Sequence, residues 1–316
     1  MKKILITGAA GMLGLEVIKY LLTEGCYEIT ALDLKNSRTT NRLKKYKNRI
    51  NIIYGDVCDK VLIPALVKDH DVIIHLASTL PPFADLKKDL SMIIDYEGTK
   101  NIVDAINFYN PKCHIIFAST MTMYKDSKNV SVKSKINLDE YDYFSQAKYD
   151  AENIIKEKLD NYTIYRLPLI LGDLKHDPFM YHGRKNDVVS FITKEDASYA
   201  FVRGIKYLDK INKKTFNVVN DEQILYKKLL NNVITIYGIN MKYILNRIFI
   251  EKNFYSPVCK YGNDLNDIIN YRNDSLDAYY NRLKKVSKNR IIPRFIAKIF
   301  IREKTLWQDL CFLVVE

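Results

Sequence analysis

The feature that most constrains the fold is an apolar strand that leads directly into three evenly spaced glycines near the start of the chain. The strand is predicted over residues 3–8, and Gly8, Gly11 and Gly14 follow at intervals of three. A helical apolar periodicity begins at once, so the glycines lie between a strand and a helix. There Gly8 permits a tight turn, Gly11 lets the backbone approach a pyrophosphate, and Gly14 lets the helix pack closely on the strand. The segment therefore predicts a dinucleotide-binding loop.

The start of this helix and the end of the next strand complete the predicted nucleotide site. Met12 and Leu13 open the helix, whose first backbone N–H groups are free to attract an anion. Asp33 ends the second apolar strand, 19 residues after the last glycine. A carboxylate there accepts hydrogen bonds from the adenosine ribose and repels a 2′-phosphate, which favours NAD over NADP. Lys35 and Arg38 lie close behind and could soften that preference, and a plain turn role is the alternative for Asp33.

Apolar runs with high β-propensity alternate with helical patterns through the first half of the chain. Strands are predicted over residues 3–8, 28–33, 50–56, 71–77, 113–119, 162–171 and 215–220. Strand–helix alternation at this spacing predicts a parallel sheet with helices on both faces. The predicted fold is α/β, a Rossmann-type doubly wound parallel sheet with a smaller C-terminal α+β substrate-binding region.

The strand–helix pattern loosens after about residue 172, which gives a predicted division of the chain. We assign residues 1–172 to the NAD-binding domain, with 190–225 contributing back to it. Residues 173–316 are assigned mainly to substrate binding and to a basic C-terminal tail. Within this second part a loop is predicted over 176–189 and a helix over 222–238.

Charge and the rarer residue types narrow the classes of partner. The net charge of +12 raises nucleic acid as a partner, but the lysines are spread along the chain and form no stripe, so nucleic-acid binding is not expected. The five cysteines and five histidines show no metal-ligand spacing, so no metal site is predicted. No apolar run is long enough to cross a bilayer, and glycines interrupt the signal-like start of the chain. The expected location is therefore the cytoplasm.

Nine short motifs within about the first 225 residues resemble those of one known family in content and in order. They are TGAAGMLG (7–14), LDL (32–34), GDVCD (55–59), HLAS (75–78), EGTKNIVDA (97–105), FAST (117–120), KYDAE (148–152), YRLPLILG (165–172) and FNVVNDEQ (216–223). The chain resembles the extended short-chain dehydrogenases/reductases, specifically the NAD-dependent epimerase/dehydratase family that acts on nucleotide sugars. The resemblance implies an NAD cofactor, a nucleotide-sugar substrate and hydride transfer between a sugar carbon and NAD.

The resemblance also implies which residues line the cofactor. At the matching positions, Asp56 and Val57 would hold the adenine. Leu76, Ala77 and Ser78 would line the cofactor near its phosphates and nicotinamide ribose. These five residues follow the third and fourth predicted strands, as a shared cofactor edge requires.

The family's catalytic positions are matched with one exception. Thr120 matches the residue that hydrogen-bonds the reacting sugar hydroxyl, Lys148 matches the lysine that holds the nicotinamide ribose, and Pro168 would border the nicotinamide and the sugar. The family has a proton-transferring tyrosine four residues before the lysine, on the same helix face. Here that position is Phe144, which has no hydroxyl. Loss of a general acid/base typically removes about 10²–10⁴ of rate.

Neighbouring residues bear on this register and on the chemistry. Glu152, four residues after Lys148, matches a family position and supports the placement of Phe144 in the tyrosine slot. Lys125 stands where a glycine is common, and Asp95 stands where an asparagine is usual. These departures bear on whether the family's usual catalytic mechanism operates, and they do not bear on whether the cofactor binds.

Three interpretations of the missing hydroxyl stay open. The first is an enzyme with a substitute proton carrier, namely Tyr143 after a modest helix rotation, Tyr124, or a water held by Thr120 and Lys148. The second is a catalytically impaired NAD(H)-binding or regulatory protein of the same fold. The third is a reductase or dehydratase variant in which the substrate supplies its own proton route. Retention of Thr120 and Lys148 favours the enzyme interpretations.

The remaining expectations concern substrate and partners. Arg184 and Lys185 are candidates to contact a substrate diphosphate, with a solvated basic loop as the alternative. Residues 289–307 alternate basic and apolar residues and could lie on an anionic membrane, or form a tail helix that covers the core or a dimer partner. The resemblance implies a homodimer formed through helices at 88–108 and 141–158.

Overall fold

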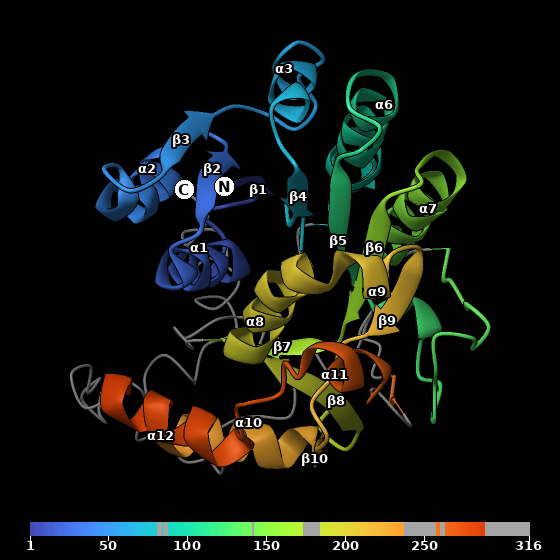
Figure 1. Ribbon diagram of the computed structural model, residues 1–316. Helices are drawn as coiled ribbons and strands as arrows, with labels where there is room; N and C mark the ends of the chain where they lie inside the picture. The colour runs from blue at the N-terminus through green and yellow to red at the C-terminus, as the bar shows by residue number, and fades with distance from the viewer. Residues whose placement is uncertain are drawn as a thin grey trace.

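A seven-stranded parallel sheet forms the centre of the computed structural model (Figure 1), in the order β3-β2-β1-β4-β5-β6-β9. The structure describes residues 1–80, 84, 88–140, 142–172, 184–236, 257–259 and 263–287. The strands of this sheet are β1 (Lys2–Thr7), β2 (Tyr27–Asp33), β3 (Asn51–Tyr54), β4 (Val72–His75), β5 (His114–Thr120), β6 (Tyr162–Leu167) and β9 (Lys214–Asn217). The prediction of a Rossmann-type doubly wound sheet is confirmed.

The described helices either cover the two faces of the large sheet or pack on a smaller second sheet. They are α1 (Met12–Glu24), α2 (Ser37–Leu43), α3 (Leu62–Lys68), α5 (Lys88–Ser91), α6 (Gly98–Tyr109), α7 (Tyr143–Lys158), α8 (Lys194–Gly204), α9 (Leu208–Ile211), α10 (Tyr226–Ile236), α11 (Asn263–Ile269) and α12 (Leu276–Ser287). Short 3₁₀ turns and one π-helical turn join them, namely η1 (Lys44–Tyr46), η2 (Met92–Glu97, π), η3 (Thr122–Tyr124) and η5 (Ile205–Tyr207). Helices α1 and α8 pack on one face, and α3, α6 and α7 pack on the other (Figure 1).

The central strands are apolar throughout because both of their faces are covered. In β1, Ile4 and Ile6 belong to the core cluster under α1 and α8, and Leu5 between them belongs to the cluster under α3, α6 and α7. All three side chains are fully buried. Successive residues of a strand point to opposite faces of the sheet, so they are buried in two different core clusters.

The strand order reverses between β1 and β4. From β1 the chain runs outward to β2 and β3, then returns to β4 on the other side of β1. Thr7 at the end of β1 pairs in register with His75 at the end of β4. Ligands of open parallel sheets bind outside the carboxyl ends of the strands at such a reversal. The glycine loop and the HLAS motif therefore meet at the place where a ligand is expected.

A second sheet of three strands lies beside the first, in the order β10-β8-β7. Its strands are β7 (Leu169–Leu171), β8 (Val188–Thr193) and β10 (Gln223–Leu225). Helices α10 and α12 lie side by side and share a core with this sheet, to which Leu229, Tyr279 and Leu283 contribute (Figure 1).

Three boundary predictions are corrected by the structure. The single strand predicted over 162–171 divides at Pro168, which has no N–H to donate to a ladder, so that β6 joins the large sheet and β7 the small one. The helix predicted over 222–238 begins only at Tyr226, because the three residues before it pair antiparallel with β8. The loop predicted over 176–189 ends earlier, since Val188 opens β8.

Some predictions fall outside the described residues. They concern residues 173–183, within the predicted loop, and the tail at 289–307 with its proposed membrane contact. The division into an NAD-binding part and a substrate-binding part remains a prediction. In the part of the chain that the structure describes, no helix combines the length and apolar character needed to traverse a bilayer.

Candidate functional site

The glycine loop forms a cradle that side chains would fill. Gly8 has φ of 66°, and a Cβ built there would come within 2.7 Å of the Ala77 backbone nitrogen. A Cβ on Gly14 would lie 2.5 Å from the Gly8 carbonyl oxygen. Helix α1 starts with Gly11 as N-cap, without a side-chain cap and without an acidic residue in its first turn. The residues present therefore fit the pyrophosphate of a dinucleotide, which needs close backbone approach and free N–H groups.

Asp33 is tied to this cradle by hydrogen bonds. Its Oδ2 accepts from the Ala10 N–H at 2.8 Å and its Oδ1 accepts from the Leu34 N–H at 2.8 Å. Burial raises the pKa of Asp33, and the two backbone bonds together with Arg42 lower it by less. The predicted position of Asp33 at the cofactor edge agrees with this geometry.

Arg42 is a site residue that sequence reasoning missed. Its guanidinium donates to the Ala10 carbonyl at 2.9 Å, which places a cation beside Asp33 at the glycine loop. The sequence predicts Arg38, not Arg42, as a cation that could soften the preference for NAD. Residues 38 and 42 are four apart on α2, so helical spacing points to Arg42 as well, and the charge of Arg38 acts on Arg42.

The residues assigned to the adenine and the phosphates lie after β3 and β4. Asp56 is exposed and its Oδ1 accepts from the Cys58 N–H at 2.9 Å, whereas Val57 is buried. Leu76 and Ala77 are half-buried, and their N–H groups donate to Thr7 at 3.2 Å each. These contacts hold both segments at the carboxyl edge of the sheet.

The remaining cofactor-site residues sit around the same opening. Met12 is 40% exposed, and its sulfur would lie 2.0 Å from a Cβ at position 172, so its side chain lies against Gly172. The Leu13 carbonyl accepts from the Ser198 hydroxyl at 3.3 Å. Pro168 is half-buried between the two sheets. The start of helix α1 therefore adjoins the residue after β7 and helix α8.

Lys148 is fixed in a buried ion pair. Its Nζ lies 3.1 Å from Asp95 Oδ1 and donates to the Ala118 carbonyl at 3.1 Å. The lysine side chain is 3% exposed and the aspartate is fully buried. Asp95 also accepts from the Ser78 hydroxyl, and from the N–H and hydroxyl of Thr79 at 3.0 and 2.5 Å. The departure noted at position 95 thus supplies Lys148 with a countercharge.

A line of neutral groups connects this pair to the cradle. His75 lies between Thr7 and Thr99, at 2.6 and 2.9 Å, and Thr99 donates to the Asp95 carbonyl at 2.6 Å. Burial, with a smaller effect of Lys148, lowers the pKa of His75 to about 3. The ring is therefore neutral at physiological pH and has a structural role.

Helix α7 carries Phe144 and Lys148 one turn apart, both largely buried, with Phe144 8% exposed. Tyr143 is the first residue of the helix and is half-buried. The helix is N-capped by Asp142, whose Oδ1 accepts from the Ser145 N–H at 2.9 Å. This places the residue predicted for the tyrosine slot on the helix and in the turn that the prediction requires.

Tyr124, one of the substitute proton carriers, is committed to another network. Its hydroxyl accepts from Arg166 and donates to Asn217 at 3.2 Å, and its side chain is fully buried. Arg166 in turn pairs with the buried Glu152 at 2.6 Å. Burial raises the pKa of Tyr124 against the opposite effect of Arg166. The donor and acceptor roles of the Tyr124 hydroxyl are therefore both taken up within this network.

Arg184 pairs with Asp126 and with Asp187, whose carboxylate is 3.1 Å from its Nε. Its role toward a substrate diphosphate remains a prediction. Among the described residues, no three His, Cys, Asp or Glu side chains gather as a metal-ligand set.

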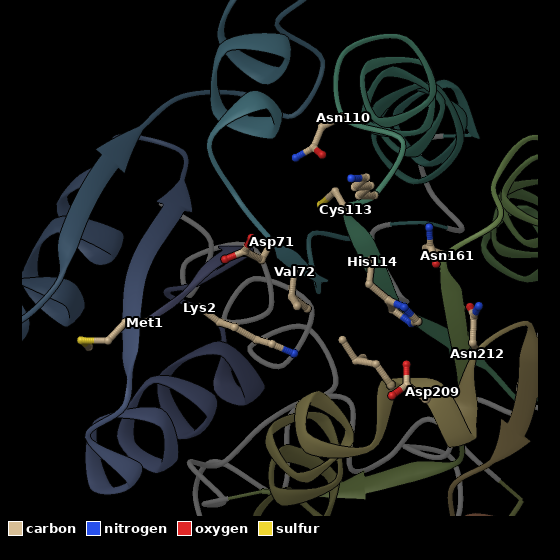
Figure 2. Close-up of a pocket in the computed structure, with 12 residues that line it drawn as sticks. Met1, Lys2, Asp71, Val72, Asn110, Cys113, His114, Asn161, Asp209 and Asn212 are labelled. Carbon is tan, nitrogen blue, oxygen red and sulfur yellow. The ribbon is translucent and has the colours of Figure 1, made fainter.

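A hollow of about 570 Å³ lies at the opposite end of the large sheet (Figure 2). Lys2, Asp71 and His114 line it, near the amino ends of β1, β4 and β5. None of the residues assigned to the cofactor or to catalysis borders it. We place the functional site at the carboxyl edge, because parallel sheets bind their ligands there.

Comparison with known proteins identifies the family and supports the fold. The model of the NAD dependent epimerase/dehydratase family matches residues 4–196. UDP-N-acetyl-alpha-D-glucosaminuronate decarboxylase of Bacillus cytotoxicus is 32% identical over 124 residues, which cover 39% of this chain and 38% of that protein. Sterol-4-alpha-carboxylate 3-dehydrogenase, decarboxylating, of Homo sapiens is 24% identical over 264 residues, which cover 76% of this chain and 67% of that protein.

Solved structures share the fold over most of their length. The dTDP-glucose 4,6-dehydratase DesIV of Streptomyces venezuelae, with NAD and TYD bound, has a TM-score of 0.78 at 15% identity, covering 91% of this chain and 97% of that one. UDP-glucuronic acid 4-epimerase of Bacillus cereus, in complex with UDP-glucuronic acid and NAD, has a TM-score of 0.74 at 18% identity, covering 90% and 99%.

Proposed function

Because the chain belongs to the NAD dependent epimerase/dehydratase family, we propose that it transfers hydride between a sugar carbon of a nucleotide sugar and NAD. The observation that carries the proposal is a connection at one sheet edge. The cradle at Gly8 abuts Ala77, and the next residue, Ser78, hydrogen-bonds the Asp95 carboxylate that pairs with Lys148. A cofactor loop and a buried lysine joined in this way suit a reaction at the nicotinamide end of a dinucleotide.

The residues that would hold NAD are Gly8, Gly11, Met12, Leu13, Gly14, Asp33, Asp56, Val57, Leu76, Ala77, Ser78, Lys148 and Pro168. When bound, NAD would accept a hydride and return it. NAD over NADP is favoured by Asp33, whose carboxylate lies at the loop and repels a 2′-phosphate. Arg42, which donates to the same loop, weakens that preference by offering a cation.

Thr120 and Lys148 are the catalytic residues of the proposal. Thr120 ends β5, and its hydroxyl would hold the reacting sugar hydroxyl. Lys148 would hold the nicotinamide ribose from a position that Asp95 fixes. Phe144 in the tyrosine slot cannot carry a proton, so the acid/base chemistry is atypical and another group must take the proton.

A second candidate function is supported by the same ion pair. Lys148 would lower the pKa of a neighbouring tyrosine less than an unpaired lysine does, because the Asp95 carboxylate offsets its charge. With no tyrosine at 144 and a neutralised lysine, the chain would bind NAD(H) without turnover and act as a binding or regulatory protein.

The decisive experiment incubates the protein with NAD⁺ and a mixture of UDP-, GDP-, CDP- and dTDP-sugars. Every sugar nucleotide is then read by mass spectrometry and by chromatographic retention, because epimers share a mass. Retained NAD is measured in the same run. A changed sugar nucleotide that is lost in Lys148→Met and kept in Lys213→Met, an exposed lysine, supports hydride transfer. Bound NAD with no changed sugar supports the second candidate.

We also propose a homodimer formed through α6 and α7. Phe108 on α6 is 78% exposed, and Lys158 of α7 pairs with Asp104 of α6 at 2.8 Å, so the two helices present a joined surface. Sedimentation of the natural protein and of Phe108→Glu tests it: a dimer that Phe108→Glu dissociates supports the interface, and a monomer in both excludes it.

A further inference from the structure

A chain of hydroxyl groups runs from Thr120 into the protein. Thr120 Oγ1 lies 2.8 Å from Thr122 Oγ1, and Thr122 Oγ1 lies 2.6 Å from Ser145 Oγ. In both contacts either oxygen can donate. The first two residues stand at and just after the end of β5, and the third is in the first turn of α7. The chain therefore bridges the strand and the helix on which the proposed reaction depends.

The hydroxyl chain ends at Ser145, the residue whose backbone contacts the Asp142 carboxylate. The Ser145 N–H donates to Asp142 Oδ1 at 2.9 Å. Burial raises the pKa of Asp142, while hydrogen bonds from the Ser145 side chain and backbone lower it by less. The charged groups that act on Asp142 in the described structure are Asp139, which raises its pKa, and Lys125, which lowers it. Asp142 is 4% exposed, so this carboxylate is kept from bulk water.

Helix capping accounts for only part of this arrangement. An N-cap aspartate needs a backbone N–H of the first turn, and the Ser145 N–H provides it. The cap does not require hydroxyls at Ser145 and Thr122, nor their alignment toward Thr120. Ser145 is fully buried, Thr120 is 6% exposed and Thr122 between them is half-buried, and the three hydroxyls hydrogen-bond one another. Hydrogen-bonded hydroxyls that can each donate in either direction can pass a proton along their line.

We propose that Asp142 is the terminal proton acceptor of the reaction, reached from the sugar hydroxyl through Thr120, Thr122 and Ser145. In the oxidation direction the sugar O–H breaks and Thr120 takes the proton. Each hydroxyl passes its own proton to the next, and the last O–H forms on the Asp142 carboxylate. The two electrons of the sugar C–H bond leave with the hydride, whose acceptor is the nicotinamide dinucleotide of the proposed function. The reverse sequence returns the proton when the sugar is reduced.

This inference rests on the proposed function and supplies the proton carrier that it lacks. Phe144 removes the hydroxyl at which a proton would ordinarily be exchanged. The relay starts instead at Thr120, at the end of β5. It leads to Asp142, the N-cap of α7, which is the helix that carries Phe144. The reaction then needs neither Tyr143 nor a rotation of α7.

The first test measures hydride transfer in the mixture of UDP-, GDP-, CDP- and dTDP-sugars with NAD⁺. Asp142→Asn keeps the helix cap, because asparagine caps as well as aspartate, and removes the proton acceptor. We expect transfer to fall about 10²-fold in Asp142→Asn and about 10-fold or more in Thr122→Val. Asp150→Asn, on the same helix, and Thr23→Val, exposed on α1, are matched controls and should keep the natural rate. An Asp142→Asn rate equal to that of Asp150→Asn overturns the inference.

The second test follows the pKa of Asp142 directly, by carbon-13 NMR of aspartate-labelled protein assigned with Asp142→Asn. The relay requires that the pKa of Asp142 lie above that of an ordinary aspartate. It also requires that the rate of hydride transfer fall as the pH drops through this pKa, and that this fall be absent in Asp142→Asn. Thr122→Val should raise this pKa, because the chain then polarises the Ser145 hydroxyl less and the carboxylate loses stabilisation. An ordinary pKa, or no response to Thr122→Val, overturns the relay.

The two tests separate failure of the relay from failure of the proposed function. Absence of NAD binding or of any sugar conversion in the natural protein counts against the proposed function. The NMR titration needs neither, so it still decides whether the hydroxyl chain reaches a carboxylate of raised pKa. If Asp142→Asn still converts the sugar nucleotide at the natural rate, the proposed function is supported and the relay is excluded.

Discussion

The two halves of the site are built by different means. The cofactor half is defined by backbone, since Gly8 and Gly14 leave no room for a Cβ and the Ala77 N–H closes the cradle. The proposed catalytic half is defined by side chains, among them Phe144 and Asp95, at which the sequence predicts departures from the family pattern. Any side chain added at these glycines meets backbone atoms, whereas a side-chain site can exchange one group for another without moving the backbone. A chain could therefore keep the cradle while its catalytic side chains change.

The largest expected effect is the loss of NAD binding when a side chain is added at a glycine of the cradle. Gly14→Val would place a side chain 2.5 Å from the Gly8 carbonyl oxygen, so helix α1 must shift. We expect NAD to bind about 10³-fold more weakly, equivalent to about 4 kcal/mol, and unfolding to be easier by about 3 kcal/mol. Titration calorimetry and thermal unfolding measure both. Gly25→Asn, at the C-cap of the same helix, is the control and should bind NAD normally.

Removing the buried lysine separates stability from chemistry in the catalytic half. Lys148→Met should lower hydride transfer about 10²-fold and destabilise the fold by about 3–5 kcal/mol, because Asp95 is left buried without its cation. The double variant Lys148→Met, Asp95→Asn should recover most of the stability and none of the activity. Recovery of activity in the double variant would show that Lys148 is not catalytic.

Restoring the hydroxyl tests whether position 144 is the tyrosine slot. Phe144→Tyr should raise transfer about 10-fold, and further when combined with Asp95→Asn, because Lys148 is then free to lower the pKa of the tyrosine. The rate is measured against pH, and the added base should appear as a new ionisation. No gain in either variant, with an unchanged fold, would count against the register or the mechanism.

The smallest expected effect concerns cofactor preference. Asp33→Asn removes the charge that repels a 2′-phosphate and leaves Arg42 in place. We expect the ratio of NADP to NAD affinity to rise about 5-fold. Arg42→Gln should move the ratio in the opposite direction. Equal ratios in all three proteins would show that neither side chain reads the adenosine ribose.

The difference between backbone and side-chain sites also decides what could be predicted from the sequence. The glycine spacing and the apolar strands are local patterns, so the sheet and the position of Asp33 at the end of β2 followed from them, and the cofactor edge remains a prediction. The ion pair of Lys148 with Asp95 joins residues far apart in the chain, and only the fold brings them together. Arg42 lay within reach of a helical-spacing argument and was overlooked.

Two fold details escaped prediction for the same reason. The division at Pro168 separates strands of two sheets, and a single apolar run does not show that its halves have different neighbours. Residues 223–225 carry the start of a helical pattern, but their pairing with β8 overrides it. The hydroxyl relay likewise depends on the approach of β5 and α7, which no local pattern shows.

The buried pair of Asp95 and Lys148 also orders the routes by which such a chain could change over generations. Replacing Asp95 first strips Lys148 of its countercharge while position 144 still offers nothing to acidify, so the intermediate loses stability without gain. Acquiring tyrosine at 144 first leaves the Asp95–Lys148 pair intact and adds a hydroxyl one helical turn from Lys148. The order of the two substitutions therefore matters: a tyrosine at 144 must be acquired before the Asp95 carboxylate can be lost without a penalty.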